Sequence, residues 1–203
     1  MGLFHRINSC YSNLSDEVLL KAEKEVPNSV FFHENNYCRI ELLPVQNLLT
    51  RQFDADEKEK YAAAGFSGDG FLNICSRDEA SYPLSNLSID KKEFKALITP
   101  ASLFYFDTVY TGHSTHRELK KHTRGFGFEN YILYFEFSDD IIINCWLDYN
   151  PISEELNVYP QRLQNILLNL GSTYGLILID WNECLTVNLA NKHALLDYMQ
   201  EAL

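Results

Sequence analysis

The stretch that decides the fold is YILYFEFSDDIIINCWLDY, residues 131–149. Apolar residues occupy the odd positions on both sides of a short polar break. This alternation predicts two strands, residues 131–137 and 141–149, joined as an antiparallel hairpin. Both apolar faces reach one core only if odd residues pair with odd residues. We therefore expect a three-residue loop, with Phe137 paired to Ile141.

The flanking sequence predicts further strands and helices. Expected strands cover residues 30–32, 37–43, 103–110, 176–180 and 185–189. Expected helices cover residues 16–26, 54–64, 89–98 (capped by Ser88) and 192–202, and a further helix begins at Pro160 and closes at Gly171. Together they predict an α+β fold with a mainly antiparallel sheet and several packed helices. We expect a single domain over residues 1–203, with a loosely tied N-terminal subdomain over residues 1–100 as a variant.

The composition is that of an ordinary globular protein. The chain has 203 residues, of which 46% are hydrophobic and 22% charged, which excludes a disordered or collagen-like chain. Its five cysteines are odd in number and form no CxxC motif, which is typical of reduced thiols. The first residues lack the apolar segment of a signal peptide, and the aliphatic runs are too short to span a bilayer. We therefore expect a soluble, cytoplasmic protein without membrane contact.

Charge is unevenly distributed along the chain. The formal net charge is −11, and residues 125–203 alone carry −9, because they hold 11 acidic side chains against only Arg162 and Lys192. An acidic region repels phosphate backbones, which argues against direct nucleic-acid binding, and it attracts a basic protein partner. The alternative is that the acidic side chains only keep the protein soluble.

Two acidic turns are the expected contact sites for such a partner. Asp180, Trp181 and Glu183 lie together between two predicted strands, and a tryptophan with a charged rim is typical of binding hot spots. Asp139 and Asp140 add two carboxylates at the hairpin loop. Turn chemistry alone also explains acidic residues at these positions.

A glycine-flanked segment, residues 112–127, holds three of the six histidines: His113, His116 and His122. A capping-box spacing within this segment predicts a short, exposed helix over residues 116–122. The spacing of the three histidines does not suit a metal site. We therefore expect neither a metal nor a cofactor.

The same segment has two functional interpretations. A basic helix hinged by glycines can close over an anionic ligand, with His116, Lys120, Lys121 and Arg124 as the contact residues. The alternative is a solvated excursion between two strands, without a ligand.

Motifs for catalysis are missing from the sequence. The glycine-rich residues 65–70 lack the Gly-Lys-Ser/Thr ending and the strand–loop–helix order of a phosphate-binding loop. Glu136 and Asp148 share the hairpin, but the expected register places them about 20 Å apart, too far for acid–base cooperation. No known nucleophile motif occurs.

These observations favour an acidic, cytoplasmic binding protein that neutralises or regulates a basic protein partner. A toxin-immunity (antitoxin-type) inhibitor is the physical archetype, because such proteins block a cationic site by charge complementarity. The first alternative is a small α+β enzyme that uses the segment with His113, His116 and His122 as a mobile active-site lid. The second is a regulatory or scaffold domain.

Overall fold

The computed structural model describes residues 28–48, 66–67, 70–71, 82–113, 116–149, 160–183 and 185–201. Strands account for 44% of these residues and helices, single 3₁₀ turns included, for 33%. The described residues contain three α-helices. The predicted fold class, a mainly antiparallel α+β sheet with several packed helices, is thereby corrected to a mostly β structure. Two of the expected helices, 16–26 and 54–64, lie outside the described residues.

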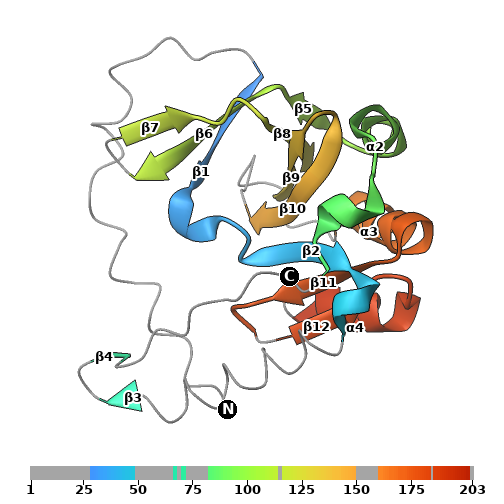
Figure 1. Cartoon of the computed structure of the whole chain (residues 1–203). Helices are drawn as coiled ribbons and strands as arrows, with labels where there is room; N and C mark the ends of the chain where they lie inside the picture. The colour runs from blue at the N-terminus through green and yellow to red at the C-terminus, as the bar shows by residue number, and fades with distance from the viewer. Residues whose placement is uncertain are drawn as a thin grey trace.

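A seven-stranded sheet, antiparallel throughout, forms the centre of the molecule (Figure 1). Its strands, in spatial order, are β12 (Leu185–Asn188), β11 (Leu176–Asp180), β2 (Ile40–Pro44), β10 (Ile141–Tyr149), β9 (Tyr131–Ser138), β8 (Thr123–Phe128) and β5 (Phe104–Phe106). The predicted strand pair at residues 176–180 and 185–189 is confirmed as β11 and β12.

A smaller sheet of three strands consists of β1 (Ser29–His33), β6 (Thr108–His113) and β7 (His116–Leu119). β1 and β6 pair in parallel, and β6 and β7 pair antiparallel. The short strands β3 (Phe66–Ser67) and β4 (Gly70–Phe71) pair with each other. The strand expected at residues 103–110 therefore breaks at Asp107, because its first half joins the large sheet and its second half the small one.

The two sheets and the helices form three layers. The α-helices α2 (Lys91–Ile98), α3 (Gln161–Tyr174) and α4 (Lys192–Glu201) pack against one face of the large sheet (Figure 1). Leu133, Phe135, Cys145 and Leu147 fill this interface from the sheet side. On the opposite face, Phe32 of β1 and Val109 of β6 pack against side chains of β9 and β10, namely Ile132, Tyr134 and Trp146.

The hairpin between β9 and β10 differs from the prediction in its loop. The loop has two residues, Asp139 and Asp140, both with positive φ (49° and 63°), and Phe137 pairs with Ile142 instead of Ile141. A β-bulge at Ile143 then shifts the register by one residue, so that Phe135 faces Cys145. The expected pairing of odd with odd residues is thus reached through a bulge within the strand, and the predicted three-residue loop is wrong.

Two helix ends also differ from the prediction. The helix α3 continues past Gly171 to Tyr174, and Gly175 ends it in the left-handed conformation (φ 65°). Gly171 is instead a packing residue, because a Cβ there would lie 2.4 Å from the carbonyl carbon of Leu189. Asp90 caps α2 in place of Ser88: its Oδ1 accepts hydrogen bonds from the backbone N–H groups of the first helical turn.

The helix expected over residues 116–122 is wrong. Residues His116–Leu119 form β7, an exposed strand whose backbone pairs with β6. A helix here would have offered only Leu119 to a core, whereas the strand satisfies its backbone through the ladder without burying any side chain. Among the described residues, no helix has the length and hydropathy needed to cross a bilayer.

Candidate functional site

The carboxylate of Asp180 is a structural group of the β11–β12 turn. It is 2% exposed, and its Oδ1 accepts hydrogen bonds from the backbone N–H groups of Asn182 (2.8 Å) and Glu183 (3.2 Å). Its Oδ2 accepts the hydroxyl hydrogen of Tyr198 at 2.8 Å. Of the three residues expected to contact a partner at this turn, only Glu183 is exposed.

Trp181 is buried, which corrects its expected role as a contact anchor. Its indole N–H donates to Oε1 of Glu41 at 3.1 Å, and its ring packs in a small cluster with Leu43, Ile177 and Ile179. All five residues of β11 are buried, and the Trp181 ring that follows them is held in the sheet, where a tryptophan N–H needs an acceptor. A partner surface would therefore not reach this ring.

The other expected acidic contacts lie elsewhere. Asp139 and Asp140 are exposed at the β9–β10 turn, and Asp140 forms an ion pair with Lys91 that lowers the pKa of its carboxyl. Asp180 pairs with Ile40 of β2, and Ile40 pairs with Leu147 of β10. Leu147 lies six residues along β10 from Ile141, which follows the Asp139–Asp140 turn. At about 3.3 Å per residue, the two turns are roughly 20 Å apart. The structure does not bring the two acidic turns together.

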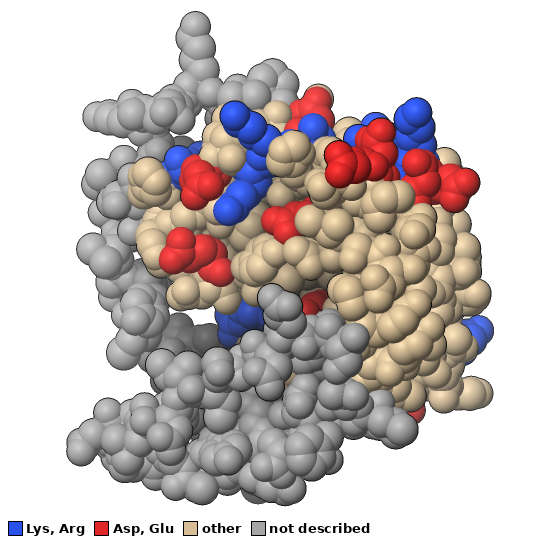
Figure 2. Space-filling model, viewed as in Figure 1, with Lys and Arg blue, Asp and Glu red and all other residues tan. Residues whose placement is uncertain are grey.

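Burial also divides the acidic C-terminal region. Among the described acidic side chains of this region, Glu129, Asp148 and Asp180 are buried. On the face shown in Figure 2, acidic and basic side chains alternate along the edge of β5–β7 and α2, and few charges lie over α3. On this face, the negative charge of the described residues does not gather into one continuous patch.

The residues of the expected lid form two separate groups. His116 lies on β7 opposite His113, whose Nε2 contacts the carboxylate of Glu34. Arg124 lies on β8, where its Nη1 donates to the carbonyl oxygens of Lys121 (2.9 Å) and Thr123 (2.6 Å).

Two of the expected lid residues contact neighbouring side chains. The guanidinium carbon of Arg124 lies 5.3 Å from the centre of the Phe137 ring, and the Lys120 ammonium lies 3.7 Å from Glu118. Within the described residues, no three His, Cys, Asp or Glu side chains are grouped to hold a metal ion.

A polar cluster that no sequence pattern predicts lies on the face of the large sheet that is opposite the helices. Oε2 of Glu136 accepts hydrogen bonds from the hydroxyl of Tyr37 (2.8 Å) and from Nδ2 of Asn144 (2.7 Å). Its Oε1 accepts one long hydrogen bond, from the Thr123 hydroxyl at 3.4 Å. We call these four residues, Tyr37, Thr123, Glu136 and Asn144, the Glu136 cluster.

Sheet register places the members of the Glu136 cluster together. Thr123 of β8 and Asn144 of β10 are the direct neighbours of Glu136 on its two sides. Asn144 reaches this position only because the bulge at Ile143 shifts β10 by one residue. Tyr37 comes from the segment between β1 and β2, and its ring packs against Trp146 (4.9 Å between centroids). Such a bulge within a run of three isoleucines leaves no sequence signal.

Within the part of the chain that the structure describes, the carboxylate of Glu136 has no basic partner. Its side chain is half-buried, and no Lys or Arg among the described residues forms an ion pair with it. Burial, together with the nearby Cys38 thiol and the Glu136 carboxylate, raises the pKa of Tyr37, so its hydroxyl stays protonated and donates. Tyr37 is 39% exposed, which leaves the cluster open to solvent. The site is a carboxylate oriented by neutral hydrogen-bond donors.

A second polar network lies farther along β10. Nε and Nη2 of Arg39 donate to Oδ1 of Asn182 (2.9 and 2.6 Å), and Nη1 donates to Oδ1 of Asn36 (3.1 Å). Beside them, burial raises the pKa of Asp148 to about 6, against the opposing effects of Asn36 and Arg39. Asp148 is four residues from Asn144, hence about 13 Å from the Glu136 cluster, still too far for a carboxylate pair.

Comparison with known proteins gives no match. The chain fits no known protein family, and neither a curated protein nor a solved structure is similar to it. The function therefore has to be argued from the geometry of the site alone.

Proposed function

We propose that the protein is a binding protein for a basic protein partner and that the Glu136 cluster receives an arginine or lysine side chain of that partner. The observation that carries the proposal is the carboxylate of Glu136, fixed by Tyr37 and Asn144 without a basic counterpart among the described residues. Neutralising or regulating that partner, as an antitoxin-type inhibitor does, is the role that this chemistry would serve.

The hydrogen bonds at Glu136 favour a guanidinium group. Oε2 is already occupied by two donors, whereas Oε1 has only the long contact with Thr123. A guanidinium can donate to Oε1 while its flat face lies near the exposed ring of Tyr37. Because the carboxylate is held in place before binding, little side-chain entropy is lost when the cation arrives.

No observation on the described residues favours the enzyme alternative. His116 lies on β7 opposite His113, whereas Arg124 lies on β8 and donates to backbone carbonyl oxygens, and neither placement favours a lid over a ligand. Arg124 donates to two backbone carbonyl oxygens and lies over the Phe137 ring, and the Lys120 ammonium lies 3.7 Å from Glu118.

Binding of a fluorescein-labelled octa-arginine peptide to the full chain, measured by fluorescence anisotropy, tests the proposal. We expect Glu136→Gln to weaken binding about tenfold, since a charge-assisted hydrogen bond contributes about 1.5–3 kcal/mol. Asp197→Asn is the matched control, because it removes the same charge from an exposed position on α4. It should change the dissociation constant less than about twofold, as is usual for exposed charges.

The affinity of the unaltered protein should also fall when salt is raised from low to physiological concentration. Equal losses in the two variants, or binding of octa-arginine no tighter than of a neutral glycine–serine peptide, would show that Glu136 does not carry the interaction.

A further inference from the structure

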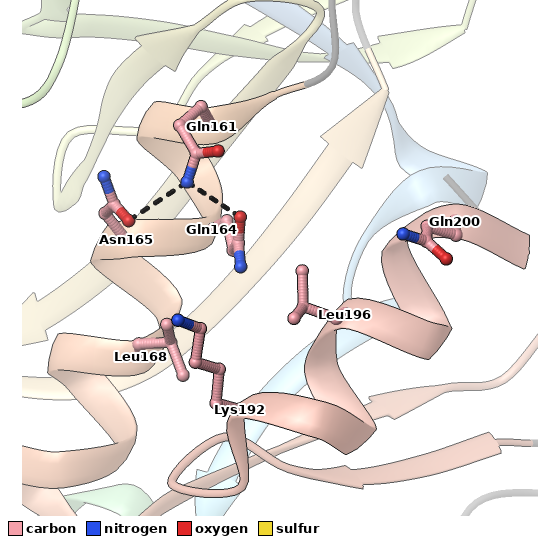
Figure 3. Close-up of a pocket in the computed structure, with 7 residues that line it drawn as sticks. All are labelled: Gln161, Gln164, Asn165, Leu168, Lys192, Leu196 and Gln200. Atoms are coloured by element: carbon pink, nitrogen blue, oxygen red, sulfur yellow. Dashed lines mark hydrogen bonds between the residues drawn. The ribbon is translucent and has the colours of Figure 1, made fainter.

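A groove of about 420 Å³ lies between α3 and α4, on the helix side of the large sheet and therefore on the face opposite the Glu136 cluster (Figure 3). Its lining includes two leucines, one lysine and several side-chain amides: Leu168, Leu196, Lys192, Gln164, Asn165 and Gln200. A volume of this size is in the range of small-molecule and peptide-end sites. No residue of the groove belongs to the site proposed above.

Hydrogen bonds along α3 orient the amides of the groove. Nε2 of Gln161 donates to Oε1 of Gln164 (2.8 Å) and to Oδ1 of Asn165 (3.2 Å). The amide oxygen of Gln164 is thereby occupied, and its NH₂ group is turned toward the space between the helices (Figure 3). Gln164 is only 3% exposed, and its NH₂ group has no acceptor among the described residues. An NH₂ group that opens into a groove can donate a hydrogen bond to a ligand that supplies an acceptor.

Lys192 adds a positive charge to the same space. Its side chain extends from the first turn of α4 toward Leu168 on α3 (Figure 3). No Asp or Glu among the described residues forms an ion pair with its ammonium. Arg162 and Lys192 are the only basic residues in positions 125–203, so this cation stands out in an acidic region.

We propose that the α3–α4 groove binds the carboxylate of an aliphatic acid. The ammonium of Lys192 and the NH₂ of Gln164 both donate, which matches an acceptor with two oxygens, and Leu168 and Leu196 supply apolar surface for the adjoining aliphatic group. A single cation suits the one charge of a carboxylate better than the two charges of a phosphate. Two sources carry this chemistry: the C-terminus of a peptide with an aliphatic last residue, and a small free acid.

Isothermal titration of the full chain with three probes tests the inference and separates the two sources. The probes are acetyl-Ala-Ala-Leu with a free carboxylate, the same peptide with a C-terminal amide, and 4-methylpentanoate. We expect the free-carboxylate peptide to bind at least tenfold more tightly than its amide, because only the carboxylate accepts from both donors. Tighter binding of the peptide than of 4-methylpentanoate supports a peptide terminus, and equal binding supports a small acid.

Two substitutions locate the binding. Lys192→Met should weaken binding of the free-carboxylate peptide about tenfold, whereas Lys121→Met, which removes a charge near β8, should leave it unchanged. Gln164→Glu, nearly the same in shape, should abolish binding by placing a negative charge in the groove, and its melting temperature reports whether it is folded.

Equal binding of the amide, equal effects of the two lysine substitutions, or no binding of any probe at millimolar concentration would overturn the inference. Glu136→Gln should bind these probes normally, so failure at the groove and failure of the proposed function are distinguishable.

Discussion

The two faces of the large sheet differ in how far the sequence pattern predicts their side-chain contacts. The face toward α2, α3 and α4 is apolar along β9 and β10, where Leu133, Phe135, Cys145 and Leu147 are buried. The other face mixes buried aromatic rings with Glu136, Asn144 and Asp148. Periodicity specifies the first face, because only burial matters there. The second face depends on which polar groups meet, and that is decided by register and by residues far apart in the chain.

Removal of an aromatic side chain from the helix face should have the largest effect. Phe135 is fully buried, and its ring stacks on Phe126 (5.6 Å between centroids) and packs against Phe94 (5.2 Å). We expect Phe135→Ala to lower the free energy of unfolding by about 3–5 kcal/mol, since the cavity cannot collapse between a sheet and a helix. Urea unfolding followed by circular dichroism measures this. A loss below about 1 kcal/mol would contradict the account of this face as the main core.

The pH dependence of the free energy of unfolding tests whether the carboxyl of Asp148 is buried on the polar face. Burial raises the pKa of Asp148 to about 6 in the folded protein, whereas an unfolded Asp titrates near about 3.9. The folded state therefore binds this proton more tightly, and the contribution of Asp148 to stability falls as pH rises from about 4 to about 6.

Asp148→Asn removes this effect. The stability of the unaltered protein relative to Asp148→Asn should fall by up to about 3 kcal/mol across that interval and stay level above it. Urea unfolding of both proteins at a series of pH values measures the difference. A difference independent of pH would show that the carboxyl of Asp148 is not held in a buried environment.

The smallest effect on stability is expected at the Glu136 cluster. Tyr37→Phe removes one of the two short hydrogen bonds to Oε2 of Glu136 but keeps the ring against Trp146. Because Tyr37 is partly exposed, we expect a loss of at most about 1 kcal/mol in the free energy of unfolding. Octa-arginine binding should still weaken, since the carboxylate loses a positioning donor. A large loss of stability with unchanged binding would indicate that the cluster serves the fold alone.

The sequence predicts the apolar face of the large sheet better than the polar face. The alternation of residues 131–137 and 141–149 predicts the central hairpin, and the apolar run at 176–179 predicts β11, because each strand must bury one or both faces. The bulge is hidden, since three successive isoleucines give no sign of which one is extra. The helix predicted over residues 116–122 fails for a related reason: polar residues there fit an exposed helix as well as an exposed strand.

The candidate site was less predictable than the fold. Trp181 next to acidic residues suggested an exposed anchor, but its N–H bonds to Glu41, 140 residues away in the chain. The bond between Tyr37 and Glu136 joins positions 99 residues apart. Contacts of this kind follow from the topology of the sheet, which a local pattern does not contain.

The central claim is that a cationic side chain docks at Glu136, and nuclear magnetic resonance tests it most directly. The side-chain NH₂ signals of Asn144 in the ¹⁵N-labelled full chain report on the oxygen to which that group donates. On titration with octa-arginine these signals should shift, and the shift should vanish in Glu136→Gln. Shifts confined to Asp139 and Asp140 or to Glu183, with Asn144 unchanged, would contradict the account and place the contact at the acidic turns instead.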